Sequence, residues 1–187
     1  MDWMDRERNF WIVGGDLRQR ALARLLREDG HTVHIAALEG EGLVAEPLGP
    51  GLALAHCVIL PLPVTRRGEI LHTPLSREEV TLPQLLDWLE PGQVLCGGMV
   101  DPQAAAAAQA RGLRLLDYYA REECMVANAV PTAEGALQIA MEELPITIHG
   151  ARALVIGYGR LGKLLSHRLS ALGARVSTAA RSWADLA

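Results

Sequence analysis

The stretch Ala153-Leu154-Val155-Ile156-Gly157-Tyr158-Gly159-Arg160-Leu161-Gly162 decides the fold of the C-terminal part of this chain. Its apolar start predicts a strand. Its second half has the pattern G-x-G-x-x-G, which follows such a strand in dinucleotide-binding folds. Gly157 permits a tight turn, Gly159 lets the backbone approach a pyrophosphate, and Gly162 lets the next helix pack closely on the strand. The stretch therefore predicts the opening of a Rossmann unit.

The residues after the motif complete the first β-α-β of that unit. Apolar residues at helical spacing predict a helix over 160–172, Gly173 ends it, and 175–179 has the composition of the next strand. The N-terminus of such a helix offers N–H groups and a partial positive charge to phosphates. We therefore expect the cofactor to contact Gly157, Gly159, Arg160, Leu161 and Gly162.

The end of the second strand indicates which dinucleotide is bound. Folds that prefer NAD place Asp or Glu there, about 20 residues after the motif, to bind the ribose hydroxyls. This chain has Arg181 and Ser182 instead. An arginine suits a 2′-phosphate because its planar fork can bond two oxygens. The sequence favours NADP over NAD, with NAD and a merely solvated Arg181 as alternatives.

Upstream of the motif, apolar runs and helical patterns alternate, which predicts a parallel sheet with helices on its faces. We predict a flavodoxin-like or Rossmann-like α/β domain over 1–145 and an incomplete Rossmann β-α-β over 146–187. A complete unit of that kind has about six strands, so we expect the chain to be a truncated form of a longer protein. The expected strands cover 10–13, 32–36, 57–60, 94–96 and 113–116; the expected helices cover 17–29, 82–89, 102–111, 122–128 and 132–144.

Composition and charge exclude several classes of protein. The formal net charge of −4 gives no electrostatic reason to expect nucleic acid or an anionic membrane as a partner. The acidic N-terminus does not resemble a signal peptide and no apolar run is long enough to span a membrane, so we expect a cytoplasmic protein. Cys57, Cys96 and Cys124 are far apart in sequence, so we expect reduced thiols and no metal site.

The chain resembles the A subunits of dipicolinate synthase. The resemblance spans nearly the whole chain and depends on short stretches that occur in the same order before the glycine motif. The stretches G-G-D-x-R-Q and P-T-x-E-G are the most specific of them. The matching stretches are Val13–Gln19, Ile59-Leu60-Pro61 with Thr65, Ser76–Val80, Asn128–Gly135 and Thr147–Gly150.

This resemblance implies a dehydrogenase chemistry in sporulating bacteria. The substrate would be a dihydrodipicolinate or its hydroxylated tetrahydro precursor, oxidised to the aromatic pyridine by loss of a hydride to NADP and of a proton to a base. It also implies the B subunit of dipicolinate synthase as a partner, and we expect a homo-oligomer.

A substrate with two carboxylates requires cationic or N–H donors. The turn Gly14-Gly15-Asp16 follows a strand at the edge where α/β folds bind ligands, so its N–H groups and Arg18 are candidates. A plain tight turn with a solvated arginine is the alternative. Thr65, in the loop after Pro61, is a further candidate.

Three residues precede the cofactor motif where an interdomain cleft is expected. Asn128 is a candidate substrate ligand, and Thr132 and Glu134 are the candidate catalytic residues: Thr132 could bond a carboxylate and Glu134 could relay a proton. Thr132 and Glu134 are equally well explained as helix-start residues. His56 and His72 are acids or bases by type only, and we assign them no catalytic role.

Two other functions stay open from the sequence. One is a different two-domain NAD(P)-dependent dehydrogenase of the 2-hydroxyacid or alanine type, whose usual His with Glu/Asp or Arg set is absent here or lies beyond the chain. The other is a non-catalytic domain that docks another subunit.

Overall fold

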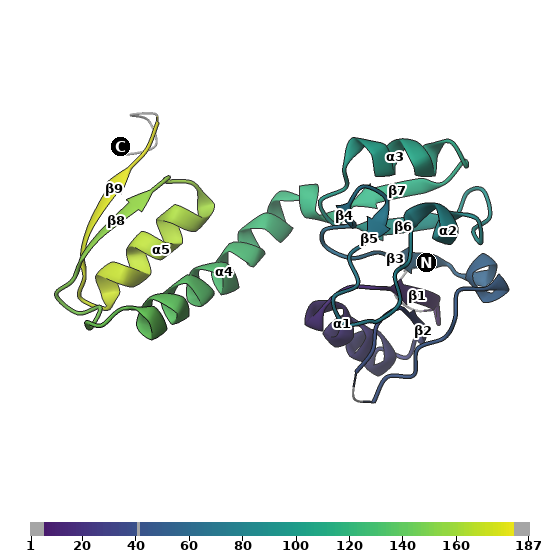
Figure 1. Ribbon diagram of the computed structural model, residues 1–187, viewed down its shortest axis with the longest axis horizontal. Coiled ribbons are helices and arrows are strands. Elements are labelled where there is room, and N and C mark those ends of the chain that lie inside the picture. The colour runs from purple at the N-terminus through teal and green to yellow at the C-terminus, as the bar shows by residue number, and fades with distance from the viewer. Residues whose placement is uncertain (1–5, 41, 182–187) are drawn as a thin grey trace. The chain divides into compact units, whose positions relative to one another are not determined.

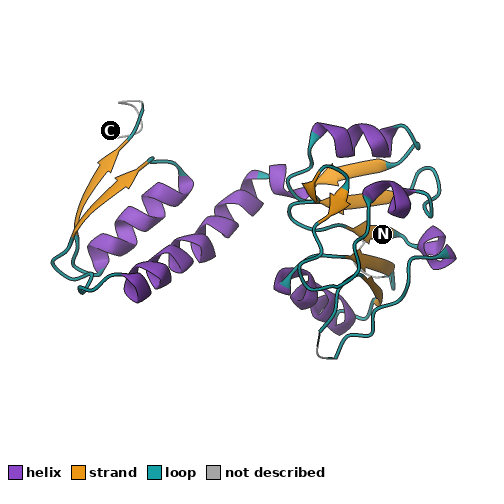
Figure 2. Ribbon diagram, viewed as in Figure 1, coloured by secondary structure: helices purple, strands orange, loops and turns teal. Residues whose placement is uncertain are grey.

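The computed structural model describes residues 6–40 and 42–181 of the chain. The chain divides into two compact units, residues 1–120 and 121–187, whose elements are labelled in Figure 1 and coloured by type in Figure 2.

The first unit is built on a parallel sheet of five strands in the order β2-β1-β3-β6-β7. Numbered among themselves, these strands have the order 2-1-3-4-5 of flavodoxin-like folds, which confirms the predicted architecture. Ligands bind such sheets at the carboxyl ends of the strands. The strands are β1 (Asn9–Val13), β2 (Thr32–Ala36), β3 (Cys57–Ile59), β6 (Val94–Gly97) and β7 (Arg114–Asp117).

Helices cover both faces of this sheet, which explains why its central strands are apolar along their whole length. Phe10 and Ile12 of β1 pack toward α1 (Leu17–Glu28) in one core cluster. Trp11 and Val13 of the same strand lie in the other cluster, with α2 (Leu82–Leu86) and α3 (Pro102–Gln109). The alternation of successive side chains across a strand thus supplies both cores.

Two short elements lie where the sequence predicts neither a strand nor a helix. An antiparallel pair forms between β4 (Thr65–Arg67), which includes the residue placed in the loop after Pro61, and β5 (Ile70–Leu71). A 3-10 helix also forms over Pro50–Leu54. Both elements are too short for a hydrophobic period to show in the sequence.

The second unit consists of α4 (Glu122–Glu143), β8 (Arg152–Ile156), α5 (Arg160–Ala171) and β9 (Arg175–Ala179). Strands β8 and β9 pair in parallel, as predicted for the Rossmann opening. The predicted helix break at Pro131 is wrong, because α4 continues through it. Ala129, Ala133 and Leu137 recur every fourth residue and are buried, and α4 lies along α5. Burial of this stripe compensates for the backbone bond that proline removes.

Since α4 belongs to the second unit, the structure places the division between the units at residues 120 and 121, whereas we expected it at 145 and 146.

Candidate functional site

The glycine turn after β1 is shaped by packing within the protein. Gly14 and Gly15 have φ values of +68° and +104°, which disfavour any residue with a side chain. A Cβ on Gly14 would also lie 2.8 Å from the Cγ2 atom of Thr73. These glycines therefore let the segment after β5 lie close over the turn.

The backbone donors of this turn are all occupied. Gly14 N donates to Ala36 O at 2.8 Å and Gly15 N donates to His72 O at 2.9 Å. Asp16 N donates to Gln19 Oε1 at 3.1 Å. The three backbone N–H groups of this turn are therefore hydrogen-bonded within the protein, and the carboxylate contact predicted for Arg18 stays a prediction.

Arg18 is held in place by two partners. Its Nε and Nη2 atoms donate to the Asp16 carboxylate, with Nη2 at 2.8 Å from Oδ2, and Nη2 also donates to Leu62 O at 2.8 Å. The hydrogen bond from Arg18 lowers the pKa of Asp16, and the Asp16 carboxylate raises the pKa of Arg18. The Arg18 side chain is half exposed, so a fixed and permanently charged guanidinium reaches the surface at this edge.

Thr65 has a structural partner. Its hydroxyl donates to Asp101 Oδ2 at 2.7 Å, and Asp101 Oδ1 accepts from Ala104 N at 2.8 Å as the N-cap of α3. The Thr65 hydroxyl lowers the pKa of Asp101. A hydroxyl whose proton is donated to Asp101 can only accept further bonds, and a substrate carboxylate has no proton to give. In this structure the Thr65 hydroxyl supports the cap of α3, and its contact with a substrate stays a prediction.

Sequence reasoning missed the residues after β7. The Asp117 carboxylate accepts backbone N–H groups from both neighbouring loops at 2.8 to 3.2 Å; the donors are Met99, Val100, Tyr119 and Ala120. An aspartate at the end of a strand, followed by Tyr118 and Tyr119, was the signal available in the sequence. The sequence gives His72 no role either, and in the structure its backbone oxygen accepts from Gly15 N at 2.9 Å.

The glycine motif in the second unit has the geometry of a phosphate cradle. Gly157 has a φ of +105°. A Cβ on Gly162 would overlap the carbonyl oxygen of Gly157, so only glycine permits this approach of α5 to β8. Around Gly159 the ideal Cβ position has no atom within 4 Å, so no described protein atom fills the space beside that backbone. No side chain caps the N-terminus of α5. The predicted roles of the glycines fit this geometry.

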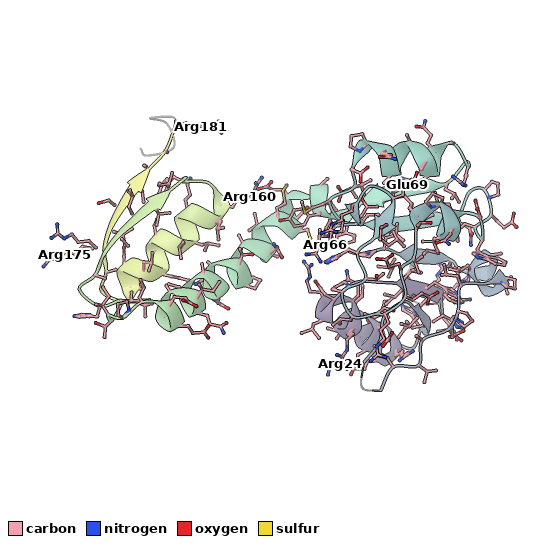
Figure 3. All side chains as sticks on the ribbon, in the orientation of Figure 1. Arg24, Arg66, Glu69, Arg160, Arg175 and Arg181 are labelled. Carbon is pink, nitrogen blue, oxygen red and sulfur yellow. The ribbon has the colours of Figure 1, made fainter. Side chains whose placement is uncertain are left out.

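Two arginines lie at the same end of this unit. Figure 3 shows Arg160 at the start of α5 and Arg181 beyond the carboxyl end of β9. Arg160 donates from Nε to Glu122 Oε1 at 2.7 Å and from Nη2 to Glu122 Oε2. Leu161, also in the motif, is 39% exposed. Ser182, the other predicted 2′-phosphate ligand, lies outside the described residues.

The three candidates on α4 are engaged within the second unit. Thr132 is not a helix cap, because its hydroxyl donates to Asn128 O at 2.7 Å inside the continuous helix. Asn128 Nδ2 lies 3.5 Å from Thr132 Oγ1. The Glu134 carboxylate accepts from Arg168 Nη2 on α5 at 3.2 Å. These contacts explain the conformations of all three residues by helix packing.

Metal-binding clusters and membrane-spanning helices are the next features to compare with the sequence. Within the described ranges, no group of three or more His, Cys, Asp or Glu residues could hold a metal ion. In that same part of the chain, no helix combines the length and the apolar character needed to cross a membrane.

Comparisons with known proteins agree with this picture. A family model described as the N-terminal domain of the dipicolinate synthase A subunit matches residues 9–119. The A subunit of dipicolinate synthase from Bacillus subtilis (strain 168) is 30% identical over 183 residues, which cover 94% of this chain and 62% of that protein. The chain thus spans less than two thirds of the length of this relative.

Solved structures resemble the chain as well. Dipicolinate synthase from Bacillus subtilis, again the A polypeptide, superposes with a TM-score of 0.78 at 28% identity, covering 97% of this chain and 63% of that one. The dipicolinate synthase A subunit from Bacillus halodurans gives 0.80 at 25% identity, covering 95% and 63%. A putative D-3-phosphoglycerate dehydrogenase from Ralstonia solanacearum gives 0.53 at 15% identity, covering 94% and 56%, and shows only a shared fold.

Proposed function

Because this chain belongs to the family of dipicolinate synthase A subunits, we propose that it carries the substrate-binding domain, and the start of the cofactor domain, of an NADP-dependent oxidoreductase. The reaction is the oxidation of dihydrodipicolinate to dipicolinate during sporulation, by loss of a hydride and a proton; its hydroxylated tetrahydro precursor would in addition lose one water. The observation that carries the proposal is the cradle formed by Gly157, Gly159 and Gly162 in a chain of this family.

The cofactor fits the residues at the start of α5. The open backbone at Gly159 and the uncapped helix N-terminus suit a pyrophosphate. Arg181 holds the 2′-phosphate, and Ser182 assists it, so NADP is preferred to NAD. NADP, when bound, accepts the hydride that the substrate loses.

The substrate domain supplies charge and orientation. The Arg18 guanidinium lies at the carboxyl edge of the sheet and binds one substrate carboxylate. Asp16 fixes the direction of that guanidinium, which limits the conformational entropy lost when the substrate binds.

The proposal extends to the cellular setting, and membership of the family supports it. We place the protein in the cytoplasm, as a homo-oligomer that associates with the B subunit of the synthase.

Two measurements on the purified protein test the proposal. Calorimetric titration should show NADP binding that is tighter than NAD binding. Formation of dipicolinate, followed by the ultraviolet absorbance of the pyridine ring, should require NADP and the dihydro substrate. Absence of both signals, in a protein that melts cooperatively, would refute the proposed function.

A further inference from the structure

Gly98 is a meeting point for two side chains of the carboxyl edge. It follows β6, between the loops after β3 and β7. A Cβ at Gly98 would lie 2.6 Å from Leu62 Cδ1 and 3.0 Å from both Cε2 and Cζ of Tyr118. The half-buried Tyr118 ring therefore lies against the backbone of Gly98, beside Leu62.

Leu62 connects this ring to the charged end of Arg18. The Leu62 carbonyl accepts from Arg18 Nη2 at 2.8 Å. The pKa of the guanidinium is raised mainly by its hydrogen bond to Asp16, and Tyr118 and Tyr119 are both near enough to add to that rise. Arg18 follows β1 and Tyr118 follows β7, with β3 and β6 between those strands. The side chain of Arg18 thus reaches along the carboxyl edge toward the tyrosine.

Asp117 positions the turn that carries the ring. Its carboxylate ties the loop after β6 to the 3-10 turn Tyr118–Ala120 through four backbone N–H groups. One donor is Met99, a non-glycine residue with a φ of +54° and an exposed side chain. Backbone strain of this kind persists where the surroundings hold it, and it concentrates at ligand sites.

We propose that Tyr118 and Arg18 together recognise a planar ring that carries carboxylates. The Arg18 guanidinium bonds a ring carboxylate, and the Tyr118 ring stacks on the face of the same ligand. This inference rests on the proposed function and assigns the residues that recognise its flat aromatic product. It makes Tyr118 a contact residue and Asp117 a positioning residue.

A ring face adds selectivity that charge alone cannot supply. Pyridine-2,6-dicarboxylate and the saturated piperidine-2,6-dicarboxylate share two carboxylates, but only the first has a flat π-face. Stacking on an aromatic side chain contributes to the binding of the flat ligand and little to that of the puckered one. The protein should therefore bind the pyridine compound more tightly than the piperidine compound, and this difference in affinity should require the Tyr118 ring.

Calorimetric titration of the protein with these two compounds tests the pair. Tyr118→Ala should weaken binding of the pyridine compound about tenfold and change binding of the piperidine compound little. Tyr118→Phe should retain most of the affinity. Gly98→Ala should weaken pyridine binding by displacing the ring without removing it. Trp88→Ala removes a partly exposed aromatic before β6, at the opposite edge of the sheet, and should change neither affinity.

The outcomes separate this inference from the proposed function. Equal pyridine affinity in wild type and Tyr118→Ala would overturn the pair, even if the protein makes dipicolinate. Lack of pyridine binding by the wild type would also overturn it. If the Tyr118 effect holds but no dipicolinate forms with NADP, the pair stands and the proposed function fails. NADP affinity and a melting curve, measured for each variant, show whether the fold is intact. If Tyr118→Ala does not fold, Gly98→Ala decides, and unchanged pyridine affinity in that variant would overturn the pair.

Discussion

Arg160 and Glu122 form an ion pair beside the first turn of α5, in which Arg160 Nε donates to Glu122 Oε1 at 2.7 Å. The hydrogen bond from Arg160 lowers the pKa of Glu122, so this carboxylate stays ionised at neutral pH. A negative charge is therefore held next to the cradle that we assign to the pyrophosphate.

Glu122→Gln should tighten NADP binding several-fold at low salt, because it removes a charge that repels the phosphates and competes for Arg160. Titrations at two salt concentrations would measure this, and the gain should shrink at the higher one. Glu123→Gln is a matched control, since its carboxylate forms an ion pair with Arg121. Weaker binding by Glu122→Gln would show that the pair is needed to orient Arg160.

Gly159→Ala should impair NADP binding, whereas Gly162→Ala should impair the stability of the second unit. At Gly159 an added methyl meets no protein atom within 4 Å, so stability should be unchanged while NADP binding is lost to the blocked approach. At Gly162 the methyl overlaps the Gly157 carbonyl, so the second unit should lose about 1–3 kcal/mol of stability. Thermal melts and NADP titrations of both variants separate the effects. Normal NADP binding by Gly159→Ala would remove the pyrophosphate from this position.

Arg181→Ala should reduce NADP affinity about tenfold or more, through the loss of charge-assisted bonds to the 2′-phosphate. NAD affinity should not change, because NAD lacks that phosphate. Arg175→Ala, at the opposite end of β9, provides the control (Figure 3). Parallel loss of NAD and NADP affinity in Arg181→Ala would argue against a role in selecting between them.

Arg18→Ala should raise the KM for the dicarboxylate substrate for two reasons: the substrate loses a hydrogen-bond donor, and Asp16 loses its cationic partner. The variant leaves Asp16 as an uncompensated negative charge at the same edge, and like charges repel. Adding Asp16→Asn should therefore recover part of the loss, and asparagine still caps α1. NADP affinity should stay constant throughout. An unchanged KM in Arg18→Ala would exclude the arginine from substrate binding.

Cys57 and Cys96 come together although 39 residues separate them, with their Sγ atoms 3.7 Å apart on adjacent strands. The hydrogen bond from Cys57 lowers the pKa of Cys96 to about 7. Since the thiolate is the reactive form, Cys96 should be alkylated readily as the pH rises through 7. Cys57→Ala removes the donor and should raise that pKa toward its ordinary value, which slows labelling at pH 7 severalfold. Mass spectrometry in a Cys124→Ser background would measure the rate, and equal rates would disprove the coupling.

Several features of this protein follow from short-range rules that the sequence displays. The Rossmann opening was predicted to within a residue or two, because Gly157 and Gly162 report a backbone angle and a close approach that no other residue allows. The parallel sheet was predicted as well, since apolar runs alternating with helical patterns admit few other arrangements. The family resemblance also came from the sequence, through motifs that keep their order.

Other features depended on partners that lie far away in the sequence. Pro131 suggested a helix end by its local chemistry, but packing along α5 kept α4 continuous. The position of Thr65 after a strand predicted a ligand contact, but in the structure its hydroxyl donates a hydrogen bond to Asp101, 36 residues away. A side chain's preferred partner is unknown until the sheet brings the loops together, and hydrogen bonds already made inside the protein are no longer available to a substrate.

The sequence by itself determined the order of strands and helices around the glycine motif, because the conformational limits of glycine and the burial of apolar side chains act on neighbouring residues. Only the tertiary structure decided which polar groups at the carboxyl ends of the strands, in each unit, already have hydrogen-bond partners within the protein. The backbone N–H groups of Gly14 and Gly15 donate to carbonyl groups of other segments. Arg18 donates to the carbonyl of Leu62, which lies beside Tyr118, and Glu122 forms an ion pair with Arg160. These relationships arise from strand order and helix packing, and no local pattern in the chain records them.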